Sequence, residues 1–79
     1  MSSFVEKRVG QDLMVYDTEK DAVHILNPTA QRILILRREG HDAEAISAAL
    51  GVEFQLPPEH PVLEEVRENL RFLEGLGLV

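Results

Sequence analysis

The sequence contains no cysteine and no tryptophan among its 79 residues. Without cysteine, the chain cannot form a disulfide, a thiolate metal site or a cysteine nucleophile. It also lacks the roughly 20 consecutive apolar residues that span a bilayer. Residues 1–9 alternate polar with apolar side chains, unlike the basic start and apolar run of a signal peptide. These absences predict a soluble, cytoplasmic protein with no membrane partner.

Basic residues are also scarce, with 8 Lys and Arg against 14 Asp and Glu, which gives a formal net charge of −6. Proteins that bind nucleic acid normally present a basic field that displaces counterions from the phosphates. The charge balance therefore predicts no nucleic-acid partner. A surplus of carboxylates is more often a solubility feature than a site for a basic partner.

The groups that catalysis or metal binding would need are not clustered. His24, His41 and His60 lack the paired spacing that metal ligation usually shows. No serine occupies a nucleophile turn, and no glycine-rich loop opens a helix at a phosphate site. The glutamates near the C-terminus lie three and four residues from Arg67 and Arg71, which predicts ion pairs within one helix. The sequence thus predicts a protein that is not an enzyme and holds no metal or cofactor.

The first third of the chain predicts three strands, over residues 4–9, 12–16 and 22–26. Gly10 and the polar stretch 17–21 separate them, as in short hairpins. An antiparallel meander follows, with the second strand in the centre and the third at an edge. Apolar residues occur at both parities, so we expect apolar groups on both faces of the sheet, one of them available to something outside this chain. One parity class contains Leu13, Val15, Val23 and Ile25, and the other contains Met14, Tyr16, His24 and Leu26.

Helix signals begin at Asn27-Pro28, because asparagine is a preferred N-cap and proline suits the first helical position. This pattern predicts a helix that runs to Arg38 and stops at Gly40. A second helix is predicted over residues 43–50, with Asp42 as its N-cap and Gly51 at its end, and a third over residues 61–74. The glycines expected to close the third helix are Gly75 and Gly77.

The predicted fold is therefore α+β, with a three-stranded antiparallel sheet followed by three helices, in a single domain over residues 1–79. The second helix and the turn at Gly51 are typical of a winged helix-turn-helix-like unit. A winged-helix transcription regulator is thus one alternative function. The loop 52–60 is long for such a unit, however, and the next helix opens with Glu64 and Glu65 instead of base-contacting residues.

The third predicted strand, residues 22–26, contains none of the lysine, proline or glycine that usually protects a sheet edge. An extended peptide could add to it as a fourth strand, with main-chain hydrogen bonds providing affinity. The equal alternative is an edge covered by the protein's own helix or by a second copy. Under this alternative, the protein is a structural adaptor or a homodimer that pairs its own third strands. The sequence does not distinguish a monomer from a homodimer.

Several of these segments resemble PqqD-like proteins, also called RiPP recognition elements. The motif consists mostly of apolar spacing around Leu26-Asn27, and the resemblance covers residues 4–79. The matching segments are Tyr16-Asp17, Ala22 to Ala30, Gly40, Ala45-Ile46, Leu50 and Leu70 to Val79.

The resemblance implies a winged helix-turn-helix-like domain that binds the leader segment of a ribosomally made precursor peptide. It also implies presentation of that peptide to a separate modifying enzyme, such as a radical SAM enzyme or a leader peptidase. In such proteins the leader adds antiparallel to the third strand, and the third helix forms the other wall of the groove. Core positions are the equal alternative for the apolar helix residues, and pairing with Glu64, Glu68 and Glu74 is the alternative for the arginines. The implied peptide-binding residues are Ala22, Val23, His24, Ile25 and Leu26 on the strand and Leu63, Val66, Arg67, Leu70 and Arg71 on the helix.

Two departures from the family pattern concern the pathway. Members that serve pyrroloquinoline quinone synthesis usually carry Cys-Asp-Gly at the end of the first helix and a tryptophan near the C-terminus. This chain has Arg38-Glu39-Gly40 at the first place and Gly75 to Val79 at the second. The peptide, the product and the partner enzyme are therefore not determined by the sequence.

Overall fold

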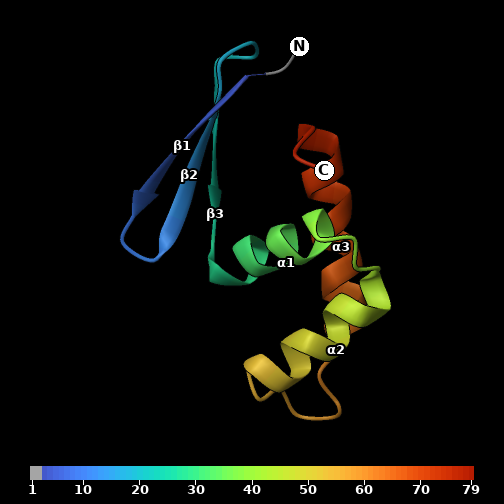
Figure 1. The fold of residues 1–79 in the computed structure, drawn as a ribbon. Coiled ribbons are helices and arrows are strands. Elements are labelled where there is room, and N and C mark those ends of the chain that lie inside the picture. The colour runs from blue at the N-terminus through green and yellow to red at the C-terminus, as the bar shows by residue number, and fades with distance from the viewer. Residues whose placement is uncertain (1–2) are drawn as a thin grey trace. The chain divides into compact units, whose positions relative to one another are not determined.

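The computed structural model describes residues 3–79, so the first two residues of the predicted alternating start lie outside it. Three strands precede three helices along the chain, which confirms the predicted α+β fold (Figure 1). The chain packs as two compact units, one ending at Arg32 and the other covering Ile33–Val79. A single domain over residues 1–79 stays a prediction. No helix in the described part is both long and apolar enough to cross a membrane.

The sheet consists of β1 (Phe4–Val9), β2 (Asp12–Asp17) and β3 (Ala22–Leu26) in the order β1-β2-β3, with antiparallel pairing throughout (Figure 1). The predicted strand bounds are confirmed, with β2 one residue longer than expected. Gly10 has a φ of 62° in the two-residue turn between β1 and β2. Glycine adopts this left-handed conformation without steric cost, which explains why the chain reverses there.

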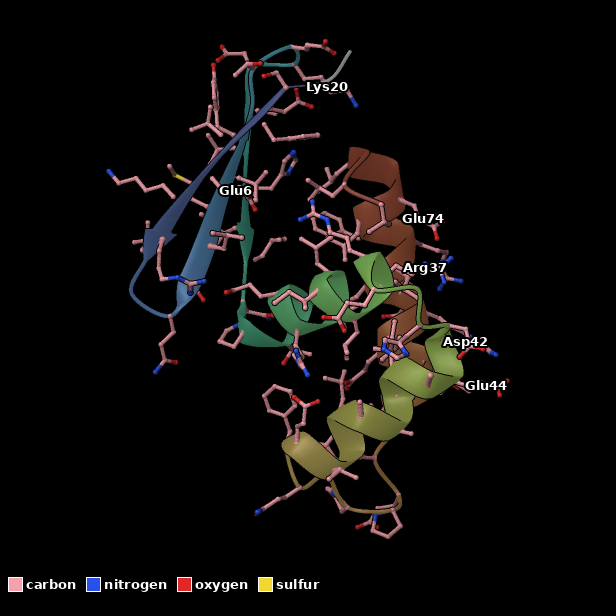
Figure 2. The ribbon with its side chains drawn as sticks, in the orientation of Figure 1. Glu6, Lys20, Arg37, Asp42, Glu44 and Glu74 are labelled. Atoms are coloured by element: carbon pink, nitrogen blue, oxygen red, sulfur yellow. The ribbon has the colours of Figure 1, made fainter. Side chains whose placement is uncertain are left out.

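The loop between β2 and β3 is stabilised by carboxylates. Asp17 is buried, and its Oδ1 accepts hydrogen bonds from the backbone N–H groups of Glu19 at 3.0 Å and Lys20 at 3.2 Å. Lys20 itself lies at the tip of this loop (Figure 2). Asp21 adopts a φ of 51°, and its Oδ1 accepts a hydrogen bond from the hydroxyl of Tyr16. These bonds fix the four-residue loop that sets the register of β3 against β2.

The register between β2 and β3 shows that the odd residues of the two strands, which the sequence pattern grouped together, lie on opposite faces of the sheet. β2 and β3 pair so that an odd residue always opposes an even one, because the loop between them contains an even number of residues. We call the side that carries Val15 and Leu26 the closed face, since both side chains are almost fully buried. We call the opposite side the open face. Its members are Val5, Lys7, Val9, Asp12, Met14, Tyr16, Val23 and Ile25.

Helix α1 (Pro28–Arg38) begins as predicted. The Oδ1 of Asn27 accepts a hydrogen bond from the backbone N–H of Ala30 at 2.8 Å, which satisfies a donor that has no partner within the helix. In the first unit, the side-chain amide of Gln31 donates to the carbonyl oxygens of Gln11 at 2.8 Å and Leu26 at 2.9 Å. These bonds attach the first turn of α1 to the end of the sheet.

Helix α2 (Ala43–Glu53) is capped by Asp42, labelled in Figure 2, whose Oδ1 accepts from the backbone N–H of Ala45 at 2.8 Å. The prediction that it ends at Gly51 is wrong. Gly51 does not adopt a positive φ; Gln55 takes the left-handed conformation at φ 52°, and the N–H of Leu56 bonds to the carbonyl of Gly51 at 3.0 Å. The helix thus continues one turn further before this αL termination.

Helix α3 (Val62–Leu76) packs against α2 within the second unit. It ends at Gly77, which has a φ of 84°, whereas Gly75 lies inside the helix and was wrongly expected to close it. The apolar core of the second unit is aliphatic, and the one buried polar residue among its described residues, Ser47, donates its hydroxyl to the carbonyl of Ala43. The buried apolar members are Ile33, Leu34, Leu36, Ile46, Leu50, Val66, Leu70, Leu73 and Leu78.

Candidate functional site

The backbone direction of β3 follows from one hydrogen bond at the far end of the sheet. The N–H of Thr18 donates to the carbonyl of Ser3 at 3.0 Å, which makes these two residues a hydrogen-bonded pair. Such pairs alternate along an antiparallel ladder. In β2, the N–H and C=O groups of even residues therefore point to β1 and those of odd residues point to β3. By the β2–β3 register, Val23 and Ile25 direct their own groups away from β2.

The outer edge of β3 therefore offers two N–H and two C=O groups, all from Val23 and Ile25. In the described part of the chain, no backbone hydrogen bond from a turn, loop or cap reaches them. Their side chains are the same ones that lie on the open face, where Val23 is 54% and Ile25 56% exposed. Main-chain pairing and apolar contact are thus available at the same two residues.

The other edge of the sheet is chemically different. The same alternation directs the main-chain groups of Glu6 and Arg8 outward from β1, and both side chains are exposed and charged. Charged side chains on an edge strand disfavour pairing with another chain. Glu6 is labelled on this part of the sheet in Figure 2. Of the two edges, β3 is therefore the one suited to accept a strand.

Sequence reasoning missed Met14 and Tyr16 as members of this site. The register places Tyr16 between Val5 and Val23, and Met14 between Lys7 and Ile25, in two rows across the open face. The missed signal is the even length of the β2–β3 loop, which determines which residues of neighbouring strands share a face. Both side chains are half-buried, and they lie on the open face directly beside the exposed side chains of Val23 and Ile25.

Tyr16 is the only tyrosine, and the chain has no tryptophan, so its phenol is a built-in spectroscopic reporter of this face. The hydrogen bond to Asp21 raises the pKa of Tyr16, with smaller contributions in the same direction from desolvation and from the charge of Asp17. A raised folded-state pKa stabilises the protein fully below the pKa of the unfolded chain. This stabilisation is lost as the pH rises through the folded-state value.

We expect the phenolate absorbance of Tyr16 to appear at a higher pH in the folded protein than in urea. Replacing Asp21 by alanine removes the acceptor of the hydrogen bond and should bring the folded midpoint down toward the unfolded one. An ultraviolet titration of both proteins measures this. Equal midpoints for folded and unfolded parent protein would contradict the role of Asp21.

The helix residues implied by the resemblance divide into two groups on α3. Val66 is fully buried and Leu70 is nearly so, which assigns both to the core alternative. Leu63 is half-buried, while Arg67 and Arg71 are exposed. These last three recur every four residues, so they form one stripe along the border of the core side of α3.

The glutamates of α3 do not neutralise this stripe. Among residues 3–79, neither Arg67 nor Arg71 forms an ion pair with a carboxylate, so the predicted intrahelical pairs are absent there. Glu65 instead approaches His60, with 3.0 Å between its Oε2 and the Nε2 of the imidazole. Both arginines are consequently available to an acidic group.

The histidines are not brought together either. His24 lies on β3, His41 approaches Glu39 at 3.8 Å between Nε2 and Oε1, and His60 pairs with Glu65. Within the described residues, no three His, Cys, Asp or Glu side chains gather as metal ligands would. The outer edge of β3 therefore offers main-chain hydrogen-bonding groups and the apolar side chains of Val23 and Ile25, and it belongs to no metal-ligand cluster of the described residues.

The family described as coenzyme PQQ synthesis protein D (PqqD) matches residues 12–79, from the start of β2 to the end of the chain. The chain belongs to the PqqD family. No curated protein sequence matches it significantly.

A solved structure shares the fold of this PqqD family member. It is described as TbiB1 in complex with the TbiA(beta) leader peptide, and it matches with a TM-score of 0.72 and 23% sequence identity. The match covers 95% of this chain and 86% of that chain. The same order of sheet and helices therefore occurs in a protein that was solved with a leader peptide.

Proposed function

We propose that this protein captures the leader segment of a ribosomally made precursor peptide at the free edge of β3, as an additional antiparallel strand. It does no bond chemistry itself and presents the peptide to a separate modifying enzyme. The observation that carries the proposal is the outward direction of the Val23 and Ile25 main-chain groups. Membership of the PqqD family and the leader-bound structural neighbour support it.

The outer edge of β3 provides the main-chain donors and acceptors that strand addition requires. An antiparallel leader strand can form hydrogen bonds to both N–H and both C=O groups at this edge, and pockets or exposed side chains beside it then select the sequence. Ordering a flexible leader costs free energy. Affinity must therefore come from a few apolar contacts in addition to the hydrogen bonds, and Val23 and Ile25 supply exposed apolar surface.

The stripe of Leu63, Arg67 and Arg71 on α3, taken by itself, is proposed as a further contact for the leader. Its half-buried leucine suits an apolar leader side chain. Its guanidinium groups, which form no ion pair among residues 3–79, suit a carboxylate of an acidic leader, which arginine can bind through two hydrogen bonds. Val66 and Leu70 support this surface from the core and hold the helix in place.

Presentation by tethering would act through effective concentration. Holding the leader places the attached core peptide near the modifying enzyme, at concentrations that reach about the millimolar range for short flexible linkers. The proposed partners are the precursor peptide and its modifying enzyme, and the proposal requires no cofactor in this chain.

The test is a titration of ¹⁵N-labelled protein with candidate leader segments, taken from small precursor-like peptides encoded in the same genome. In the free protein, the amides of Val23 and Ile25 should exchange with solvent faster than that of His24, whose N–H faces β2. On binding, saturable shifts should centre on residues 22–26, and the Val23 and Ile25 amides should become protected.

The location of the shifts decides the outcome. Binding with no added protection at Val23 and Ile25 would contradict strand addition at this edge. Absence of any shift in a folded protein, with light scattering that reports a dimer, would favour the alternative in which a second copy covers β3.

A further inference from the structure

We propose that the β3 border of the open face, formed by Val23 and Ile25, selects the leader sequence, so that the leader residues directly opposite these two must be β-branched or aromatic apolar residues. The inference rests on the proposed strand addition at β3. It adds a specificity determinant on the side of the sheet opposite to buried Val15 and Leu26.

The first step is geometric. Because the outward main-chain groups belong to Val23 and Ile25, an antiparallel strand forms its hydrogen-bonded pairs with these two residues. Directly opposed residues have side chains on the same face of a sheet. A leader residue i opposite Ile25 and residue i+2 opposite Val23 would therefore project onto the open face. Residue i+1, opposite His24, would project onto the closed face.

The second step concerns what those leader side chains would meet. Residue i+2 would extend the row Val5, Tyr16, Val23, and residue i would extend the row Lys7, Met14, Ile25. Tyr16 and Met14 are half-buried with strands on both sides, whereas Val23 and Ile25 are more than half exposed with a neighbour on one side only. A fourth strand would supply the missing neighbour.

The chemistry of these rows favours particular residues. Cross-strand pairs of aromatic and β-branched side chains stabilise antiparallel sheets relative to alanine pairs. A charged leader residue at i or i+2 would instead lose hydration against an apolar neighbour. The preferred leader motif thus has apolar, β-forming residues at positions i and i+2. Residue i+1 between them projects onto the closed face and is not subject to this preference.

The experiment uses whichever candidate leader segment binds in the titration described under the proposed function. Isotope-filtered NOEs from the methyl groups of Val23 and Ile25 identify peptide residues i+2 and i. Replacing Ile25 by lysine should weaken binding of this peptide by roughly tenfold or more, because an apolar contact is replaced by a charge. Ile25→Thr retains the β-branched shape, so it should fold like the parent and lose less affinity.

Val9→Lys is the matched control. Val9 lies on the open face with 53% exposure, close to that of Ile25, but it belongs to β1 at the opposite edge. Both variants change the net charge equally, so only position distinguishes them. Val9→Lys should bind the peptide like the parent protein.

A charge swap completes the test. A peptide with aspartate at position i should bind the parent protein weakly and regain affinity for Ile25→Lys. Unchanged affinity of Ile25→Lys for the native peptide, or of the parent for the aspartate peptide, would overturn the inference. If the Val23 and Ile25 amides become protected on binding while affinity is unchanged, strand addition is retained and only the specificity inference is wrong. If these amides are not protected in any complex, the proposed strand addition itself is wrong.

Discussion

Replacing Val66 by glutamate is expected to unfold the helical unit, not to remove a single binding contact. The Val66 side chain has no exposed surface in the middle of the amphipathic α3. A glutamate there buries a charge with no partner, at a cost of several kcal/mol, and also forfeits the transfer energy of the valine side chain. The sum is comparable to the whole stability of a small domain, roughly 5–15 kcal/mol. Circular dichroism during urea unfolding measures the loss.

Arg67→Glu is the control for this prediction because Arg67 is the next residue and is exposed. Since this arginine has no ion pair in the described chain, its replacement should change stability by no more than about 1 kcal/mol. A Val66→Glu protein that unfolds at the same urea concentration as Arg67→Glu would contradict the core assignment of Val66.

Proline at position 25 is expected to weaken peptide capture strongly while leaving the sheet folded. The Ile25 N–H points away from β2, so the sheet loses no ladder hydrogen bond when proline replaces it. An added leader strand would lose that donor and leave a carbonyl unsatisfied, which costs roughly 1–3 kcal/mol, or about fivefold to 150-fold in Kd. The proline ring would also obstruct the approaching strand. Calorimetric titration with the leader segment that binds the parent protein measures the affinity.

Two further proline variants distinguish the edge from the sheet interior. Glu6→Pro removes an outward N–H from β1, so it should retain both the fold and the affinity. His24→Pro removes an N–H that faces β2 and leaves its acceptor in the ladder unsatisfied, so it should destabilise the sheet by roughly 1–3 kcal/mol. Equal affinities of Ile25→Pro and the parent would show that the leader does not pair with this edge.

The sequence predicted those features that local chemistry determines. Gly10, Asn27 and Asp42 marked element boundaries correctly because each residue acts on its immediate neighbours. Gly10 forms a left-handed turn, and the other two cap free N–H groups at the start of a helix. The order of strands and helices, and hence the α+β class, followed from these boundaries and from apolar periodicity.

Features that depend on packing or register were not predictable in the same way. Gly51 resembled a helix end, but α2 continues because Gln55 can adopt the terminating conformation one turn later. The parity of Val23 and Ile25 suggested a shared class with Leu13 and Val15, whereas the loop register places them on the opposite face. The spacing of Val66 and Leu70 was compatible with both core and groove, and burial alone separates these alternatives.

The unequal edges of the sheet have a consequence for aggregation. A β-fibril grows only if both edges of the sheet in each molecule can pair with another strand, because each added molecule must then present a new free edge. In this sheet, the β1 side presents outward backbone flanked by Glu6 and Arg8, and only the β3 side is uncharged. Edge-to-edge association in concentrated solution should therefore stop at pairs joined through β3, and a peptide that occupies β3 should suppress even those pairs.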